Sequence, residues 1–224
     1  MTKHPSANSV VKVGDGRGFV IKHRAKVARP KGLPKIFKLV PFTEYQCIIT
    51  AAHCLRKLPL PIALRDTPSR TYQNLIGSLD GATSNVPAEC IFVDSVADIA
   101  VLGCPDDQAL PDEAEAYHSF IDNLPVLRID SASSGTGWML SLGGHWVAIT
   151  LNVRPGRFGR VGLEIDPTEA GQSGSPILNA AGRAVGAVAI GSGDLNLTTG
   201  KHTNERCGPQ PILTRNLPAW MVST

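Results

Sequence analysis

Short apolar runs, each bounded by turn residues, recur along the whole chain. In the first half, a turn leads into a strand at 14–21, and further strands are expected at Ile36–Val40, Cys47–Ala52, Asn74–Leu79, Ile91–Val93 and Ile99–Leu102. In the second half, strands are expected at Val126–Ile129, Gly137–Leu142, Trp146–Val153, Val161–Ile165, Pro176–Leu178 and Ala184–Ile190. Many short strands joined by Gly- and Pro-containing turns predict an all-β fold.

An acidic stretch divides this pattern in two. Residues 104–124 hold two prolines and six acids, namely Asp106, Asp107, Asp112, Glu113, Glu115 and Asp122. We expect a connector there, with a short helix around Asp112–Phe120, and a second short helix at Leu217–Val222. The sequence therefore predicts an N-terminal β unit at 1–104, an acidic connector at 105–124 and a C-terminal β unit at 125–224.

Charge and composition exclude several classes of partner. The net charge of +3 is too small to indicate a nucleic acid or a membrane surface as partner. Seven basic residues lie between Lys22 and Lys38 without an acid; we interpret them as a solvated loop rather than as a docking site for an acidic partner. No run approaches the roughly 18 apolar residues of a membrane span. The segment Met1–Val13 has no apolar run typical of a secretory signal, so we expect a cytoplasmic protein.

The most distinctive stretch is Glu169–Leu178, where Ser173 lies between Gly171-Gln172 and Gly174. Glycines permit the sharp turn that an oxyanion hole needs, in which two backbone N–H groups converge on one point. We predict that these donors are the N–H groups of Gly171 and Ser173. A serine hydroxyl becomes a strong nucleophile only when a base accepts its proton.

A base and a carboxylate are available earlier in the chain. His53 follows an apolar strand in the run Thr50-Ala51-Ala52-His53-Cys54. Asp98 opens the apolar run Ile99–Leu102, where a lone acid is costly to bury unless it is paired. Asp94 is the alternative carboxylate. No Cys or His spacing is typical of a metal site, so we expect no metal and no cofactor.

These three motifs, in the order His, Asp, Ser, resemble those of the chymotrypsin-like (trypsin-fold) serine proteases. The Gly14–Ile21 opening and the amide residue before the serine are similar to the HtrA-like and glutamyl-endopeptidase-like branches, although no PDZ-sized extension follows Thr224. The resemblance implies two six-stranded antiparallel β-barrels and a short C-terminal helix. His53 and Asp98 would lie on the first barrel and Ser173 on the second, as general base, orienting acid and nucleophile.

Departures from the family pattern carry information about control. Digestive trypsins have an aspartate before the nucleophile, which pairs with a freed N-terminus; Gln172 cannot form that ion pair. We therefore expect no activation by that kind of cleavage. Cys54 stands where secreted members have a bridged cysteine, but Lys38 occupies roughly the partner position. Cys47 is a second candidate partner, and we expect the cysteines to be reduced and mostly buried.

Substrate specificity can be inferred only from the family resemblance. Counting residues along the chain from the shared motifs assigns the pocket for the P1 side chain to Pro167, Thr168, Val188, Ala189, Ile190 and Gly191. An uncharged pocket favours small or apolar P1 residues, unless Glu169 or Asp194 points into it. The resemblance implies a serine endopeptidase acting on a protein or peptide substrate. The alternatives are a catalytically silent relative that binds a peptide or a regulatory protein, and a protease active only within a larger assembly.

Overall fold

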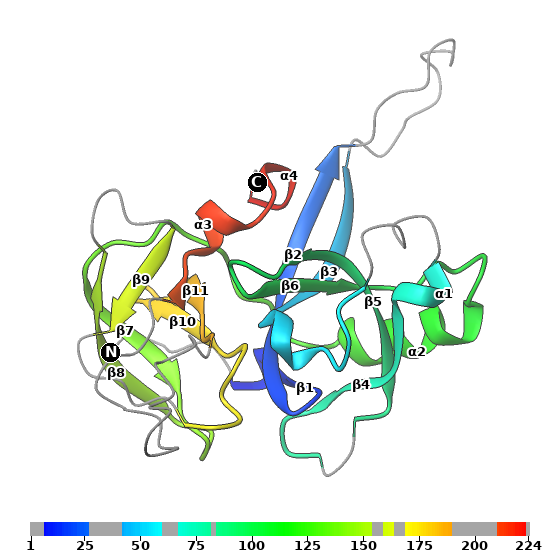
Figure 1. Cartoon of the computed structure of the whole chain (residues 1–224), viewed down its shortest axis with the longest axis horizontal. Coiled ribbons are helices and arrows are strands. Elements are labelled where there is room, and N and C mark those ends of the chain that lie inside the picture. Colours follow the sequence, from blue (N-terminus) through cyan, green and yellow to red (C-terminus); the bar gives the residue numbers. More distant parts are fainter. Residues whose placement is uncertain are drawn as a thin grey trace, which may run out of the picture.

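The first half of the chain forms a closed antiparallel barrel. The computed structural model describes residues 7–26, 42–59, 67–81, 84–153, 159–163, 169–189 and 210–222. The barrel strands, in the order β1-β2-β3-β6-β5-β4 (Figure 1), are β1 (Val10–Val13), β2 (Gly16–Lys26), β3 (Phe42–Thr50), β4 (Thr71–Ser78), β5 (Val86–Asp94) and β6 (Ile99–Gly103). Alternation along β2 gives the barrel two apolar faces, with Val20 inside it and Phe19 and Ile21 outside.

The second half forms another six-stranded antiparallel sheet, in the order β11-β10-β7-β8-β9-β12. Its strands are β7 (Gly135–Leu140), β8 (Trp146–Asn152), β9 (Arg160–Leu163), β10 (Pro176–Asn179), β11 (Ala184–Ala187) and β12 (Gln210–Pro211). An antiparallel bridge between Gly186 and Ile212 joins its two edges, so this sheet is nearly closed as well. The predicted all-β architecture of two six-stranded antiparallel units is confirmed.

Short helices cover the ends of the strands. They are η1 (Ala7–Ser9), η2 (Ala52–Cys54), α1 (Thr67–Arg70), α2 (Pro111–Ile121), α3 (Leu213–Asn216) and α4 (Ala219–Val222). The helix expected in the acidic stretch is α2, which buries Ala114, Tyr117 and Ile121 on one face. In the described part of the chain, no helix combines the length and the apolar character that crossing a membrane requires.

The outer face of the barrel packs against the second sheet. Phe19, Ile49 and Val101 share an apolar cluster with Leu140 and Leu178 of the second sheet. In Figure 1, α3 and α4 run from the second sheet back towards the barrel, and α4 packs against β2. The two units therefore share an apolar core, and this core holds the loops on either side of it in a defined relative position.

Two expectations about the strands are wrong. Residues 126–129 form no strand; Leu127 and Ile129 instead make isolated parallel bridges with Ile21 and Ala184. The basic loop expected from Lys22 begins as strand, because Lys22 and Arg24 point to one side of β2 and each pairs with Glu44 of β3, at 2.5 and 2.7 Å. The strand expected at 36–40 lies outside the described residues.

The described cysteines are reduced, as predicted. Cys47, Cys54 and Cys90 are buried and free, and Cys104 is free and half-buried. The residue that faces Cys54 is Gly16, because a Cβ at Gly16 would lie 2.5 Å from the Cys54 Sγ atom. Lys38, which we expected roughly at the position of a disulfide partner for Cys54, lies outside the described residues.

Candidate active site

His53 emerges from the barrel at the end of β3. The strand ends at Thr50, and the single turn η2 buries Ala52 and Cys54 while the His53 side chain stays 40% exposed. The small residues Ala51 and Ala52 allow this turn to pack tightly against the barrel. The local sequence thus places an imidazole at the surface on a rigid, buried support.

Asp98 holds His53 at two points. The Asp98 Oδ2 atom lies 2.7 Å from His53 Nδ1, and the Asp98 Oδ1 atom accepts a hydrogen bond from the His53 backbone N–H at 3.0 Å. Asp98 adopts a positive φ of 58°, which Asp tolerates better than most residues and which often marks functional sites. Asp94, the alternative carboxylate, instead caps the turn by accepting from the N–H groups of Val96 and Ala97.

Ser173 lies on a turn whose shape depends on two glycines. Gly171 and Gly174 have φ values of +93° and +82°, a region that residues with a side chain rarely adopt. The turn is closed by hydrogen bonds from the Gln172 N–H to the Glu169 carbonyl (3.1 Å) and from the Ser175 N–H to the Gln172 carbonyl (2.9 Å). Within the described residues, the N–H groups of Gly171 and Ser173 donate to no protein acceptor.

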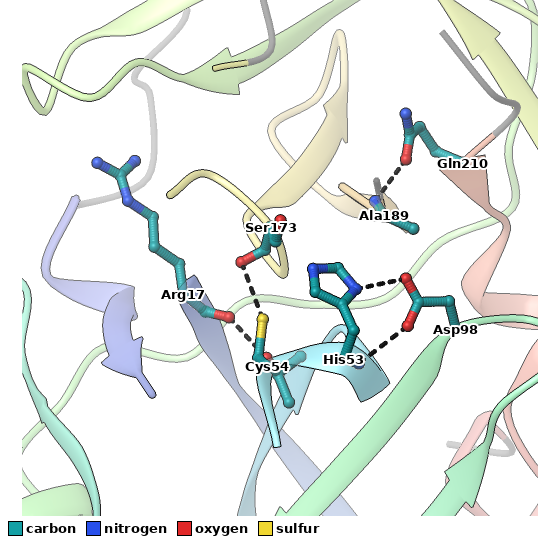
Figure 2. A network of polar contacts seen from close by, with 8 residues as sticks. Arg17, His53, Cys54, Asp98, Ser173, Ala189 and Gln210 are labelled. Carbon is teal, nitrogen blue, oxygen red and sulfur yellow. Dashed lines mark hydrogen bonds and ion pairs between the residues drawn. The ribbon is translucent and has the colours of Figure 1, made fainter. Parts of the chain in front are cut away.

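The Ser173 turn is fastened to the barrel beside His53. The Ser173 carbonyl accepts hydrogen bonds from the Arg17 N–H at 2.7 Å and from the Cys54 thiol at 3.6 Å. In Figure 2 the imidazole lies between the Asp98 carboxylate on one side and the Ser173 turn on the other. In the described part of the chain, no hydrogen bond joins the Ser173 hydroxyl to His53.

The predicted specificity pocket is described in part. Pro167, Thr168, Ile190 and Gly191 lie outside the described residues, whereas Val188 and Ala189 are buried. The Val188 carbonyl accepts from the Gly174 N–H at 2.6 Å, which ties this segment to the Ser173 turn.

Sequence reasoning missed two polar residues of this region. Gln210, which is 2% exposed, accepts a hydrogen bond from the Ala189 N–H at 2.5 Å through its Oε1 atom (Figure 2). Arg17, which lies between Gly16 and Gly18, is 5% exposed. Neither had a signal in the sequence, because Arg17 was read as part of a turn and Gln210 stood outside every motif.

The thiol beside His53 is not a nucleophile. Desolvation by burial raises the pKa of Cys54 to about 11 and that of Cys47 to about 12, so both remain protonated at neutral pH. Cys54 therefore acts as a small packing residue and hydrogen-bond donor. Among the described side chains, no group of three or more His, Cys, Asp or Glu residues could hold a metal ion.

Comparisons with known proteins give weak likenesses. No protein-family model matches the chain, and no curated protein matches its sequence. The inactive form of the Rv3671c protease of M. tuberculosis superposes with a TM-score of 0.42 at 16% identity, over 86% of this chain and 88% of that one. The HtrA-type protease AlgW with a decapeptide gives 0.45 at 14% identity, over 93% of this chain and 62% of that one.

A serine protease of a human pathogenic astrovirus gives a TM-score of 0.44 at 15% identity, over 86% of this chain and 96% of that one. Likenesses of this size transfer no residue roles. The chain itself has two six-stranded antiparallel sheets that pack together, and His53, Asp98 and the Ser173 turn lie where these two sheets meet.

Proposed function

We propose that the chain is a serine endopeptidase that uses Ser173 as nucleophile, His53 as general base and Asp98 as orienting acid. The observation that carries this proposal is the two-point contact between Asp98 and His53. Because Nδ1 of the imidazole is committed to the carboxylate, Nε2 is the nitrogen left to accept a proton. A histidine with a purely structural role would not need this fixed tautomer on a half-exposed ring.

The chemistry follows from these positions. The Ser173 Oγ atom attacks the scissile carbonyl carbon while its proton passes to His53 Nε2, and the N–H groups of Gly171 and Ser173 stabilise the resulting oxyanion. Collapse of the tetrahedral intermediate expels the amine, which takes the proton from His53 and leaves an acyl group on Ser173. A water molecule, deprotonated by His53, then hydrolyses this ester. Catalytic hydrogen bonds commonly tighten only when substrate binds, so the Ser173–His53 contact is expected to form in the complex.

The substrate is a protein or peptide with a small or apolar P1 side chain. The buried positions of Val188 and Ala189 beside the Ser173 turn support this preference. Burying a charged P1 group against them would be costly unless a counter-charge were present. A peptide library varied at P1 tests this: preferred cleavage after alanine, valine or leucine is expected, and preferred cleavage after arginine or glutamate would contradict it.

Labelling with a fluorophosphonate probe tests the nucleophile. We expect one covalent adduct, located on Ser173 by peptide mass spectrometry and abolished by Ser173→Ala. Ser175→Ala is the matched control, because Ser175 lies two residues away and is fully buried; labelling should survive there. Labelling of Ser173→Ala at the wild-type rate would refute the proposed nucleophile.

The same assay separates the alternatives. A folded protein that takes up no adduct alone or with other proteins would be a silent relative that binds a peptide or regulatory partner through this surface. Labelling that begins only after lysate from the native host is added would indicate a protease active within an assembly. Labelling of the purified chain alone supports a self-sufficient enzyme.

A further inference from the structure

Arg17 is a buried cation that binds backbone carbonyls rather than any carboxylate of the described residues. Its side chain reaches from β2 to the second sheet, where Nη1 donates to the carbonyls of Ser141 (2.9 Å) and Leu140 (3.3 Å) and Nη2 donates to that of Leu142 (3.2 Å). Among the described residues, no Asp or Glu forms an ion pair with it. Desolvation lowers its pKa, and a buried charge without a counter-ion is costly. We therefore expect this side chain to have a specific structural or functional role.

The three carbonyls belong to the end of β7 and the turn that leads to β8. Strand β7 pairs with β10 from Gly137 to Met139, so the Leu140 carbonyl lies beyond the last pair of that ladder. The turn closes on itself through a hydrogen bond from the Ser141 N–H to the His145 carbonyl at 2.9 Å. Arg17 thus binds a row of carbonyl oxygens that continues past the paired part of the strand.

This turn lies beside the predicted oxyanion hole. Gly171 has no Cβ, but one built there would lie 3.7 Å from the Leu142 Cδ2 atom, at ordinary van der Waals distance. The Gln172 Nε2 atom donates to the Leu140 carbonyl at 3.4 Å, and the Gln172 Oε1 atom accepts from the Glu169 N–H at 2.8 Å. Arg17 and Gln172 therefore share one carbonyl oxygen, one approaching it from the barrel and the other from the Ser173 turn.

The backbone of Arg17 holds the other side of the Ser173 turn. Its N–H donates to the Ser173 carbonyl at 2.7 Å, and its own carbonyl accepts from the Thr50 hydroxyl at 2.7 Å. Gly174 packs directly onto that carbonyl, because a Cβ at Gly174 would lie only 1.9 Å from the oxygen. A single residue thus contacts the nucleophile turn through its backbone and the loop beside Gly171 through its side chain.

We propose that Arg17 is the positioning residue that holds the Ser173 turn in its oxyanion-binding shape. This inference rests on the proposed serine-protease function. In this proposal Arg17 takes the place of the ion pair between a freed N-terminus and an aspartate, which Gln172 cannot form. The site is then assembled without a freed N-terminus. Arg17 acts through Leu140–Leu142 and the Ser173 backbone and does not itself touch substrate. Its loss should therefore lower the rate of the chemical step and leave binding nearly unchanged.

The test compares fluorophosphonate labelling rates of wild type, Arg17→Ala, Arg17→Lys and the control Arg24→Ala. A misplacement of about 1 Å costs roughly 100-fold in rate, so the maximal rate constant should fall about 100-fold in Arg17→Ala, with less than a threefold change in the half-saturating probe concentration. Guanidinium ion at millimolar concentration should restore part of the rate, because it can donate to the same three carbonyls. Arg24, an exposed arginine of β2, should show neither effect.

Arg17→Lys provides a second test, which remains usable if Arg17→Ala does not fold. It keeps the charge but not the planar fork of donors, so we expect a folded protein with a labelling rate about tenfold lower. A folded Arg17→Lys or Arg17→Ala with the wild-type rate would overturn the inference, as would a slow, folded Arg17→Ala that guanidinium does not accelerate. A wild type that stays unreactive even with added lysate would instead reject the proposed function, and the two failures are thereby distinguished.

Discussion

Gly174 offers the sharpest test of how the Ser173 turn is packed. Its φ of +82° is strained for any residue with a Cβ, and that Cβ would meet the Arg17 carbonyl oxygen at 1.9 Å and the Thr50 hydroxyl at 2.7 Å. Backbone atoms cannot move aside by changing rotamer. Gly174→Ala must therefore separate the turn from β2 and break the Gly174–Val188 hydrogen bond of 2.6 Å.

The expected cost has three sources. The left-handed backbone costs about 1–2 kcal/mol with a Cβ present. Forcing an extra methyl group into packed surroundings costs about 1–3 kcal/mol, and one lost hydrogen bond about 0.5–1.5 kcal/mol. We therefore expect Gly174→Ala to lower the free energy of unfolding by roughly 3–6 kcal/mol and to abolish fluorophosphonate labelling of Ser173.

Gly144→Ala isolates the conformational part of this cost. Gly144 has nearly the same φ, +77°, but no atom lies within 4 Å of the Cβ that it would carry. Only the backbone strain of about 1–2 kcal/mol should apply there. Urea unfolding followed by tryptophan fluorescence measures both variants. If the two substitutions cost the same to within about 1 kcal/mol, the close approach of Gly174 to Arg17 is wrong.

Three further predictions concern charge and protonation. Asp98→Asn should lower the labelling rate of the protein by about 10⁴-fold, because His53 then loses the partner that fixes its tautomer; a loss below tenfold would contradict the assigned role. Burial raises the pKa values of the Cys54 and Cys47 thiols to about 11 and 12, so both should react with iodoacetamide at pH 8 only after unfolding. Mass spectrometry of the peptides measures this, and rapid alkylation of either cysteine in the folded protein would contradict it. Burial also raises the pKa of Glu89, so native protein binds more protons than unfolded protein above about pH 4.5, and stability falls as the pH rises through that window. Glu89→Gln should make this fall shallower in urea unfolding between pH 4 and 7, and an unchanged slope would count against the burial argument.

The sequence predicted what depends on local chemistry. Short apolar runs with turn residues predicted the all-β class, and the helix expected in the acidic stretch matches α2 within one residue at each end. The two motifs around His53 and Asp98 could also be found, because both place polar groups at the ends of buried strands. The elements and motifs are specified by neighbours in the chain, whereas the contact between His53 and Asp98, 45 residues apart, was expected from the family resemblance.

What escaped prediction depends on contacts between distant segments. Lys22 and Arg24 were read as a loop, because their partner Glu44 becomes their neighbour only once β2 and β3 pair. Arg17 lies 123 or more residues from the carbonyls that it binds, so no spacing could indicate its role.

A crystal structure of the fluorophosphonate adduct tests the central claim most directly. We expect phosphorus bonded to Ser173 Oγ, with the phosphoryl oxygen about 2.7–3.1 Å from the backbone nitrogens of Gly171 and Ser173. His53 should remain on Asp98 and turn Nε2 towards the adduct. An adduct on another residue, or a phosphoryl oxygen directed to solvent with both N–H groups unengaged, would contradict the account.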